Sequence, residues 1–166
     1  MTTATLPHGS VLPRERSTVF HKLLSTAPDT ATTILRLVLG LIILPHGLQK
    51  TLGLFGGYGF SGTMGFFTQQ LHIPALFALL AILAETAGAL GLITGLFTRV
   101  AALGVFSVMA TAAFMVHRSN GFFMNWSGTQ AGEGYEYHLL AMGIALVLML
   151  KGGGKYSVDG ALSRGK

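Results

Sequence analysis

Cysteine is absent from this 166-residue sequence. Without thiolates the chain cannot form disulfides, and it cannot ligate an iron–sulfur cluster or a metal through sulfur. Charge is also scarce, because Asp, Glu, Lys and Arg together make up 10% of the residues, against about 25% in an average soluble domain. With a mean hydropathy of +0.60, this composition excludes an ordinary soluble domain and indicates a chain that lies mostly in a membrane.

Four apolar runs account for this composition, and each approaches the ~17–25 residues that a membrane-spanning helix needs. They are Ala31–Leu48, Pro74–Phe97, Val100–Val116 and Tyr135–Leu150. The sequence therefore predicts an all-α fold, an integral membrane four-helix antiparallel transmembrane bundle. The fourth run is short and depends on its aromatic flank or on a thin bilayer. Two segments rich in Gly and aromatic residues, 52–73 and 117–134, are expected to lie as interfacial aromatic loops on the outer side.

The distribution of cations predicts the orientation. Arg14, Arg16 and Lys22 precede the first run, Arg99 lies between the second and third, and four further cations follow the fourth. By the positive-inside rule, both termini face the cytoplasm of a bacterial-type (inner) membrane, and the net charge of +5 does not indicate a nucleic-acid partner. The chain then divides into a cytoplasmic arm at 1–28, a four-helix transmembrane domain at 29–151 and a cytoplasmic tail at 152–166.

Two charged residues, Arg36 and Glu85, interrupt the apolar runs. A carboxylate at such a depth costs roughly 2.5 kcal/mol or more unless it has a partner. Counting ~1.5 Å per residue from the outer helix ends places the two residues at similar depths, so we expect a buried Arg36–Glu85 pair. Two interpretations stay open for this polar core: a staple that fixes helix register, or a proton-transfer or ligand-binding group.

A second polar cluster is expected near the outer ends of the same helices. Its candidate pocket residues are His46, Lys50, His117, Glu136 and His138. Because Glu136 and His138 are about 200° apart around a helix, only one of them can face the bundle interior. Imidazoles and a cation beside an apolar slot suit a quinone headgroup, although the same residues can equally be interfacial anchors. The spacing gives no i,i+4 histidine pair, so no metal site is assigned.

These residues occur in an ordered pattern that resembles the DoxX family of small four-helix membrane proteins. The pattern consists of Arg36…Gly40…Gly47…Lys50, a Gly/Phe loop, Pro74…Glu85…Gly88…Gly91…Gly95…Thr98-Arg99, Gly134-Tyr135-Glu136, Gly152–Gly154 and Ser157-Val158-Asp159. It covers about residues 31–160. The resemblance implies a respiratory or redox setting, because some relatives are subunits of thiosulfate:quinone oxidoreductases and others accompany quinone detoxification or oxidative-stress responses.

From the residues and the resemblance together, we expect an accessory or quinone-interacting subunit of a membrane redox or oxidative-stress system. No covalent cofactor and no catalytic residue is assigned, and a membrane quinone is the candidate ligand. The expected partners are the lipid bilayer and either a redox partner protein or further copies of this chain. Two alternatives stay open: a non-catalytic membrane scaffold or assembly partner, and a small proton-coupled transporter that uses Glu85.

Overall fold

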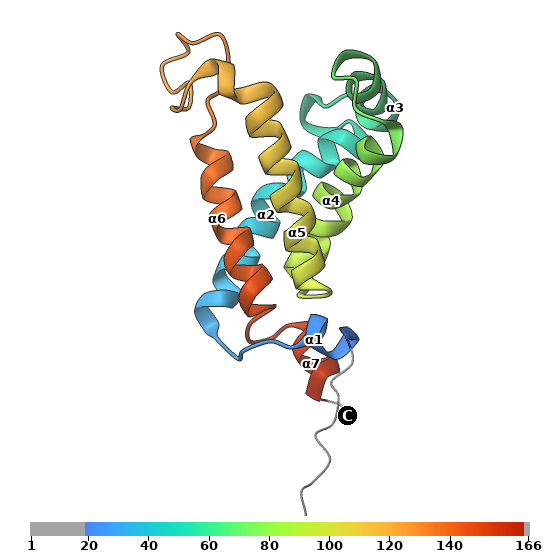
Figure 1. The fold of residues 1–166 in the computed structure, drawn as a ribbon, viewed down its shortest axis with the longest axis vertical. Coiled ribbons are helices and arrows are strands. Elements are labelled where there is room, and N and C mark those ends of the chain that lie inside the picture. Colours follow the sequence, from blue (N-terminus) through green and yellow to red (C-terminus); the bar gives the residue numbers. More distant parts are fainter. Residues whose placement is uncertain (1–18, 165–166) are drawn as a thin grey trace, which may run out of the picture.

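The computed structural model describes residues 19–164, and over this range the chain is helical and contains no strand. Four longer helices pack side by side, with α2 and α5 each contacting both α4 and α6 (Figure 1). They are α2 (Thr30–Leu52), α4 (Ala75–Thr94), α5 (Thr98–Ala112) and α6 (Glu136–Lys151). The all-α prediction is therefore confirmed for the described residues, whereas most of the predicted arm at 1–28 lies outside them.

Shorter helices occupy the two ends of the molecule. They are α1 (Val19–Leu24), α3 (Gly59–Gly65) and α7 (Val158–Arg164). The end that carries α3 and the loop 121–135 is called the loop end below, and the end that carries α1 and α7 is called the tail end (Figure 1). The loop end corresponds to the side that the sequence predicts to be outer.

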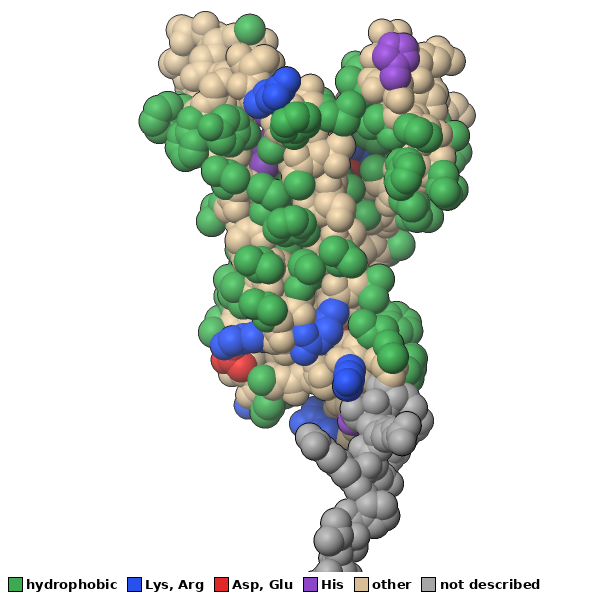
Figure 2. Space-filling view, viewed as in Figure 1, with side chains coloured by type: hydrophobic (Ala, Val, Ile, Leu, Met, Phe, Trp, Pro, Cys, Tyr) green, Lys and Arg blue, Asp and Glu red, His purple; other side chains and the backbone are tan. Residues whose placement is uncertain are grey.

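Within the described range, three stretches of helix are long and apolar enough to cross a membrane: Thr30–Leu52, Ala75–Thr94 and Thr98–Asn120. The third joins α5 to a π-helical turn, Ala113–His117, and a 3-10 turn, Arg118–Asn120. Apolar side chains cover much of their outward surface (Figure 2). The protein is a membrane protein with three helices of spanning length, whereas α6, with 16 residues, extends only ~24 Å.

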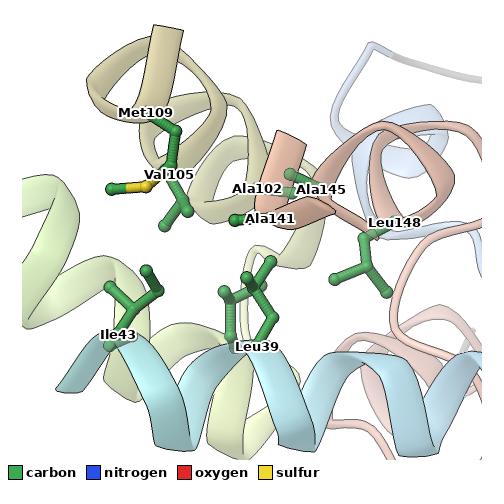
Figure 3. Close-up of a cluster of buried hydrophobic side chains, with 10 residues drawn as sticks. Leu39, Ile43, Ala102, Val105, Met109, Ala141, Ala145 and Leu148 are labelled. Carbon is green, nitrogen blue, oxygen red and sulfur yellow. The ribbon is translucent and has the colours of Figure 1, made fainter. Parts of the chain in front are cut away.

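The apolar core lies between α2, α4, α5 and α6 (Figure 3). Leu39 and Ile43 of α2 face this junction, and both are at most 2% exposed. On α6 the buried positions include Ala141 and Ala145, whose small side chains let α5 come close. Such close packing matters in a membrane, since helices there gain little from removing apolar surface from lipid.

Glycines of α2 bring this helix into backbone contact with α4. A β-carbon at Gly47 would lie 2.7 Å from the carbonyl carbon of Glu85, and one at Gly40 would lie 3.1 Å from the carbonyl oxygen of Ala89. Neither position has room for a side chain unless the helices separate. The contact therefore fixes the relative height of the two helices, with Gly47 level with Glu85.

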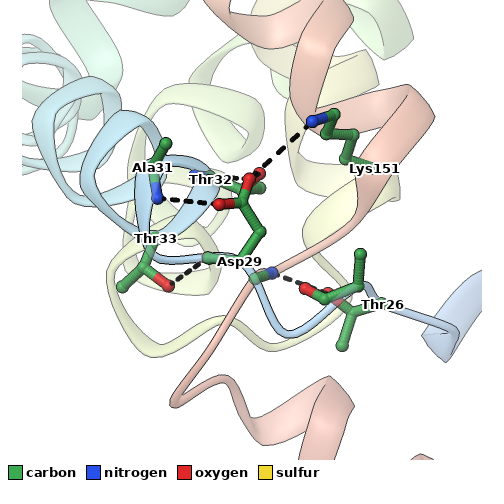
Figure 4. A network of polar contacts seen from close by, with 8 residues as sticks. Thr26, Asp29, Ala31, Thr32, Thr33 and Lys151 are labelled. Carbon is green, nitrogen blue, oxygen red and sulfur yellow. Dashed lines mark hydrogen bonds and ion pairs between the residues drawn. The ribbon is translucent and has the colours of Figure 1, made fainter.

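The first residue before α2, Asp29, caps this helix. One carboxylate oxygen accepts a hydrogen bond from the backbone N–H of Ala31 at 3.1 Å, and the other accepts from the backbone N–H and the hydroxyl of Thr32 at 3.2 and 2.5 Å (Figure 4). Lys151, at the end of α6, lies 3.7 Å from the same carboxylate. These contacts, the Thr32 hydroxyl first among them, lower the pKa of Asp29 below its usual 3.8.

The short connection between α4 and α5 is closed by residues that come later in the chain. The carboxylate of Asp159, on α7, accepts hydrogen bonds from the backbone N–H groups of Phe97 at 2.7 Å and Thr98 at 2.8 Å, where α5 begins. Arg99 donates to the carbonyl of Leu150 in the last turn of α6 at 2.8 Å. The predicted tail is thus bound to the start of α5 through Asp159.

Acid should weaken the fold through Asp29. A carboxylate with a lowered pKa contributes stability that is fully present above its unfolded-state pKa of 3.8 and is lost as the pH falls through the lower folded-state value. We expect Asp29→Ala to lower the thermal midpoint at neutral pH and to reduce the decline below pH 4, measured in detergent from about pH 2.5 to 7. Parallel pH profiles for the variant and the wild type would contradict this assignment.

Because α2 and α4 approach closely, the effect of a Gly→Ala substitution on stability should depend on whether the glycine lies at their contact. Gly47→Ala should reduce the free energy of unfolding by about 1–3 kcal/mol, because the added methyl group forces the two backbones apart. Gly143→Ala on α6 is the matched control, since a β-carbon there meets nothing within 4 Å. Unfolding in mixed micelles measures both, and equal effects of the two substitutions would refute the role given to Gly47.

Candidate functional site

Glu85 is a buried charge in the middle of α4, far from either helix terminus. Its side chain is 4% exposed, and its Oε2 lies 2.6 Å from the Nζ of Lys50, in the last turn of α2. The Lys50 ammonium group also lies 3.5 Å from the carbonyl oxygen of His46. Because Gly47 brings the two backbones together, the lysine can reach inward from the helix end and neutralise a carboxylate within the membrane span.

Aromatic side chains of α2 and α6 lie beside this ion pair. The rings of His46 and Tyr137 have their centroids 6.3 Å apart, and both residues interact electrostatically with the Glu85 carboxylate. His46 is exposed, while the Tyr137 hydroxyl is buried. The two rings therefore lie between the buried Glu85 carboxylate and the surface of the molecule.

Two histidines continue this arrangement toward the loop end. The rings of His117 and His138 have centroids 4.2 Å apart, and His138 is only 7% exposed. The Nδ1 of His117 lies 2.8 Å from the carbonyl oxygen of Glu133. Since a carbonyl can only accept, this Nδ1 donates the hydrogen bond.

Three buried polar atoms around the ion pair have no hydrogen-bond partner among residues 19–164: Glu85 Oε2, the Tyr137 hydroxyl and His138 Nδ1. Glu85 Oε2 is held by the charge of Lys50 without hydrogen-bond geometry. Nearly all buried polar atoms in folded proteins are bonded to protein or to an ordered small molecule. His46, Lys50, Glu85, Tyr137 and His138, called the polar cluster below, can therefore bind a ligand that both donates and accepts hydrogen bonds.

The predicted pair of Arg36 and Glu85 is wrong, although both residues are buried. Arg36 Nη1 donates to the carbonyls of Leu92 and Ile93 at 2.5 and 2.6 Å, so the guanidinium caps the last turn of α4. The prediction treated the outer ends of the two helices as level. With Gly47 against Glu85, Arg36 instead lies ~16 Å further along α2, toward the tail end.

Glu136 and His138 take different positions, and His138 is the one that faces the interior. Glu136 begins α6, and its Oε1 accepts a hydrogen bond from the indole N–H of Trp126 at 3.3 Å. It therefore ties the loop to the helix and does not line the polar cluster. Within residues 19–164, no group of three or more His, Asp or Glu side chains is placed to hold a metal ion.

The largest of the described cavities lies away from the polar cluster. It is a groove of about 640 Å³ along α4 and α5, lined mainly by apolar and small side chains. They include Phe77, Ala81, Ala84, Gly88, Gly104 and Ser107. A second cavity lies at α3 and also contains no residue of the polar cluster.

Sequence reasoning missed Tyr137 in the polar cluster and the role of Asp159 at the tail end. Tyr137 stands between Glu136 and His138 in the sequence. A hydroxyl group at the start of an apolar run is itself a sign of a buried polar site. Asp159 was noticed only as part of a family pattern. Its role as a cap for α5 cannot be inferred from neighbouring residues in the sequence, because the amides it binds are 61 and 62 residues away.

These observations define an all-helical membrane protein with an ion pair enclosed between its helices. The chain belongs to the DoxX family, whose model matches residues 31–118, more than half of the sequence. No curated protein and no solved structure matches the chain. Arg36, His46, Lys50 and Glu85 lie inside the matched range, whereas α6 lies beyond it and supplies the rest of the polar cluster.

If Lys50 and Glu85 form an ion pair, replacing both residues should reduce the free energy of unfolding less than replacing Lys50 alone. Lys50→Met should destabilise the protein by about 3–5 kcal/mol, because it leaves the Glu85 carboxylate buried without a counter-charge. The double variant Lys50→Met/Glu85→Gln should recover most of this loss in detergent unfolding measurements. Arg36→Met is the control: its partners are carbonyls, so Glu85→Gln should not rescue it. Additive effects of the Lys50 and Glu85 substitutions would contradict the pair.

Proposed function

We propose that this DoxX-family protein is a quinone-interacting subunit of a membrane redox or oxidative-stress system, and that the polar cluster binds the quinone headgroup. The proposal rests on the Glu85 carboxylate, which lies in mid-helix, is paired with Lys50 and is surrounded by buried polar atoms without partners. An ionisable group at this depth is a functional site by default. The other two fully buried charges among residues 19–164, Arg36 and Asp159, bind helix termini and need no further role.

The chemistry of the cluster suits both redox forms of a quinone. The oxidised headgroup carries two carbonyl oxygens, which can accept hydrogen bonds from the Lys50 ammonium and the Tyr137 hydroxyl. The reduced form carries hydroxyl groups, which can donate to the Glu85 carboxylate. Electrons would come from a redox partner protein, and the share of this chain would be to bind the headgroup and to exchange protons with it.

The surface position of two cluster residues gives a route for the ligand. His46 is exposed on α2, and the Lys50 side chain is 22% exposed, so the cluster is accessible from that side. A headgroup entering there would meet His46 first and Glu85 last. This order favours a ligand that arrives from the lipid, with a flat polar head and an apolar tail that stays outside.

The membrane arrangement that accompanies this function has four spans. We propose that α6 is the fourth transmembrane helix, because it packs between α2 and α5 along the apolar core. Its length of ~24 Å is compatible with a locally thinned bilayer. Both termini would face the cytoplasm of a bacterial-type inner membrane, since the exposed cations gather at the tail end (Figure 2).

Quinone binding can be tested on the full chain in lipid nanodiscs by calorimetric titration with a short-chain benzoquinone, with empty nanodiscs subtracted. Wild type should bind saturably. His46→Ala and Tyr137→Phe should each weaken binding by about 5–10-fold, the value of one hydrogen bond. His72→Ala and Tyr58→Phe are matched controls, because both residues are exposed and lie outside the cluster. Equal binding by cluster and control variants would refute the site.

Measurements on the wild type and its variants would also distinguish the quinone proposal from two other functions. A scaffold without a ligand would show no saturable binding and would retain its partner proteins in the Glu85→Gln variant. A proton-coupled transporter would move protons across liposomes, and Glu85→Gln would abolish that flux. The quinone proposal requires saturable binding that depends on His46 and Tyr137, which neither alternative gives.

A further inference from the structure

The tail end presents a second surface, independent of the polar cluster. It consists of α1, α7 and the loop between α6 and α7, which together cover the ends of the long helices (Figure 1). α1 packs against both α7 and α5, and the rings of Phe20 and Phe97 meet edge to face with centroids 6.4 Å apart. The surface is therefore attached to the spanning helices and lies where they leave the membrane.

Exposed charge on this surface is almost entirely positive. The exposed cations are Lys22, Lys151, Lys155 and Arg164. The two carboxylates nearby are already occupied: Asp159 is 1% exposed and bonded to backbone amides, and Asp29 caps α2 beside Lys151. Among residues 19–164, Lys22 and Lys155 form no ion pair with an acidic side chain. Their positive charge is thus not balanced by an acidic side chain in the described part of the chain.

Apolar side chains project from the same surface. Val19 is 75% exposed, Phe20 51% and Tyr156 77%. Tyr156 has a φ of 57°, a left-handed conformation that is costly for an aromatic residue, and Arg36 lies 3.5 Å from its carbonyl oxygen. Lys155 Nζ lies 5.0 Å from the centre of the Tyr156 ring. The loop therefore holds an aromatic ring and a cation outward together.

We propose that this surface, α1 and α7 with the loop that carries Lys155 and Tyr156, binds anionic phospholipids of the adjoining leaflet. Cations without acidic partners attract the phosphate groups of these lipids, and the exposed aromatic and aliphatic side chains enter the headgroup region. The loop end has no such excess, because Glu133 and Glu136 supply opposite charge to its exposed cation Arg118. The surface thus recognises the negative charge of the lipid, and it does so only at the tail end of the protein.

Native mass spectrometry of the full chain in detergent measures this binding directly, with phosphatidylglycerol and phosphatidylcholine titrated separately. Phosphatidylglycerol should bind more tightly. Lys155→Gln should weaken it about five-fold, and Lys22→Gln/Lys155→Gln about 25-fold, from about 1 kcal/mol for each cation near an anionic lipid. Arg118→Gln is the matched control, because it removes an exposed cation that also stacks on an aromatic ring, and it should change the affinity less than two-fold.

Salt gives a second readout that does not depend on the variants folding equally well. Raising sodium chloride from about 0.1 to 0.5 M should weaken phosphatidylglycerol binding to wild type and leave phosphatidylcholine binding unchanged, since only the charged contact is screened. Equal affinities of wild type for the two lipids would overturn the proposal. An equal loss in Lys155→Gln and Arg118→Gln would also overturn it, because lipid would then be attracted by net charge and not by this surface.

Discussion

The approach of α2 to α4 at Gly40 and Gly47 determines where the charges of this protein lie. Inside a bilayer, helices are held by close packing and by polar contacts, so the relative height of two backbones decides which side chains meet. With Gly47 against Glu85, Lys50 is one turn further along and reaches the carboxylate at 2.6 Å. The same offset carries Arg36 to the last carbonyls of α4. The contact between these two backbones thus places Lys50 beside the buried Glu85 and Arg36 beside the end of α4.

The buried charges therefore fall into two groups with different roles. At the tail end, Arg36 and Asp159 satisfy backbone groups that a helix terminus leaves without partners, and they stabilise the fold. At mid-height, Glu85 and Lys50 satisfy no helix terminus, and the buried atoms beside them keep unused hydrogen-bonding capacity. This division explains how a chain with so few charges can use some of them for stability and leave others for binding.

The sequence was sufficient to locate the helices and insufficient to pair their charges. Apolar runs predict α2, α4 and α6 to within a few residues, because composition alone decides which segments enter a membrane. The buried faces containing Arg36 and Glu85 also follow from helical spacing. The pairing failed because it depends on the offset between two helices, which no local pattern encodes. The Gly-rich segment after α2 folds partly as α3, since packing against α2 overrides its weak helical propensity.

The cap formed by Asp159 joins parts of the chain that the ribosome makes at different times. Its carboxylate binds amides 61 and 62 residues earlier, at the start of α5. At about 5–20 residues per second, roughly 3–12 s separate the synthesis of these partners. During that interval the amides of Phe97 and Thr98 lack the Asp159 cap. Closure of the tail end by Asp159 is consequently a late step in the formation of the structure.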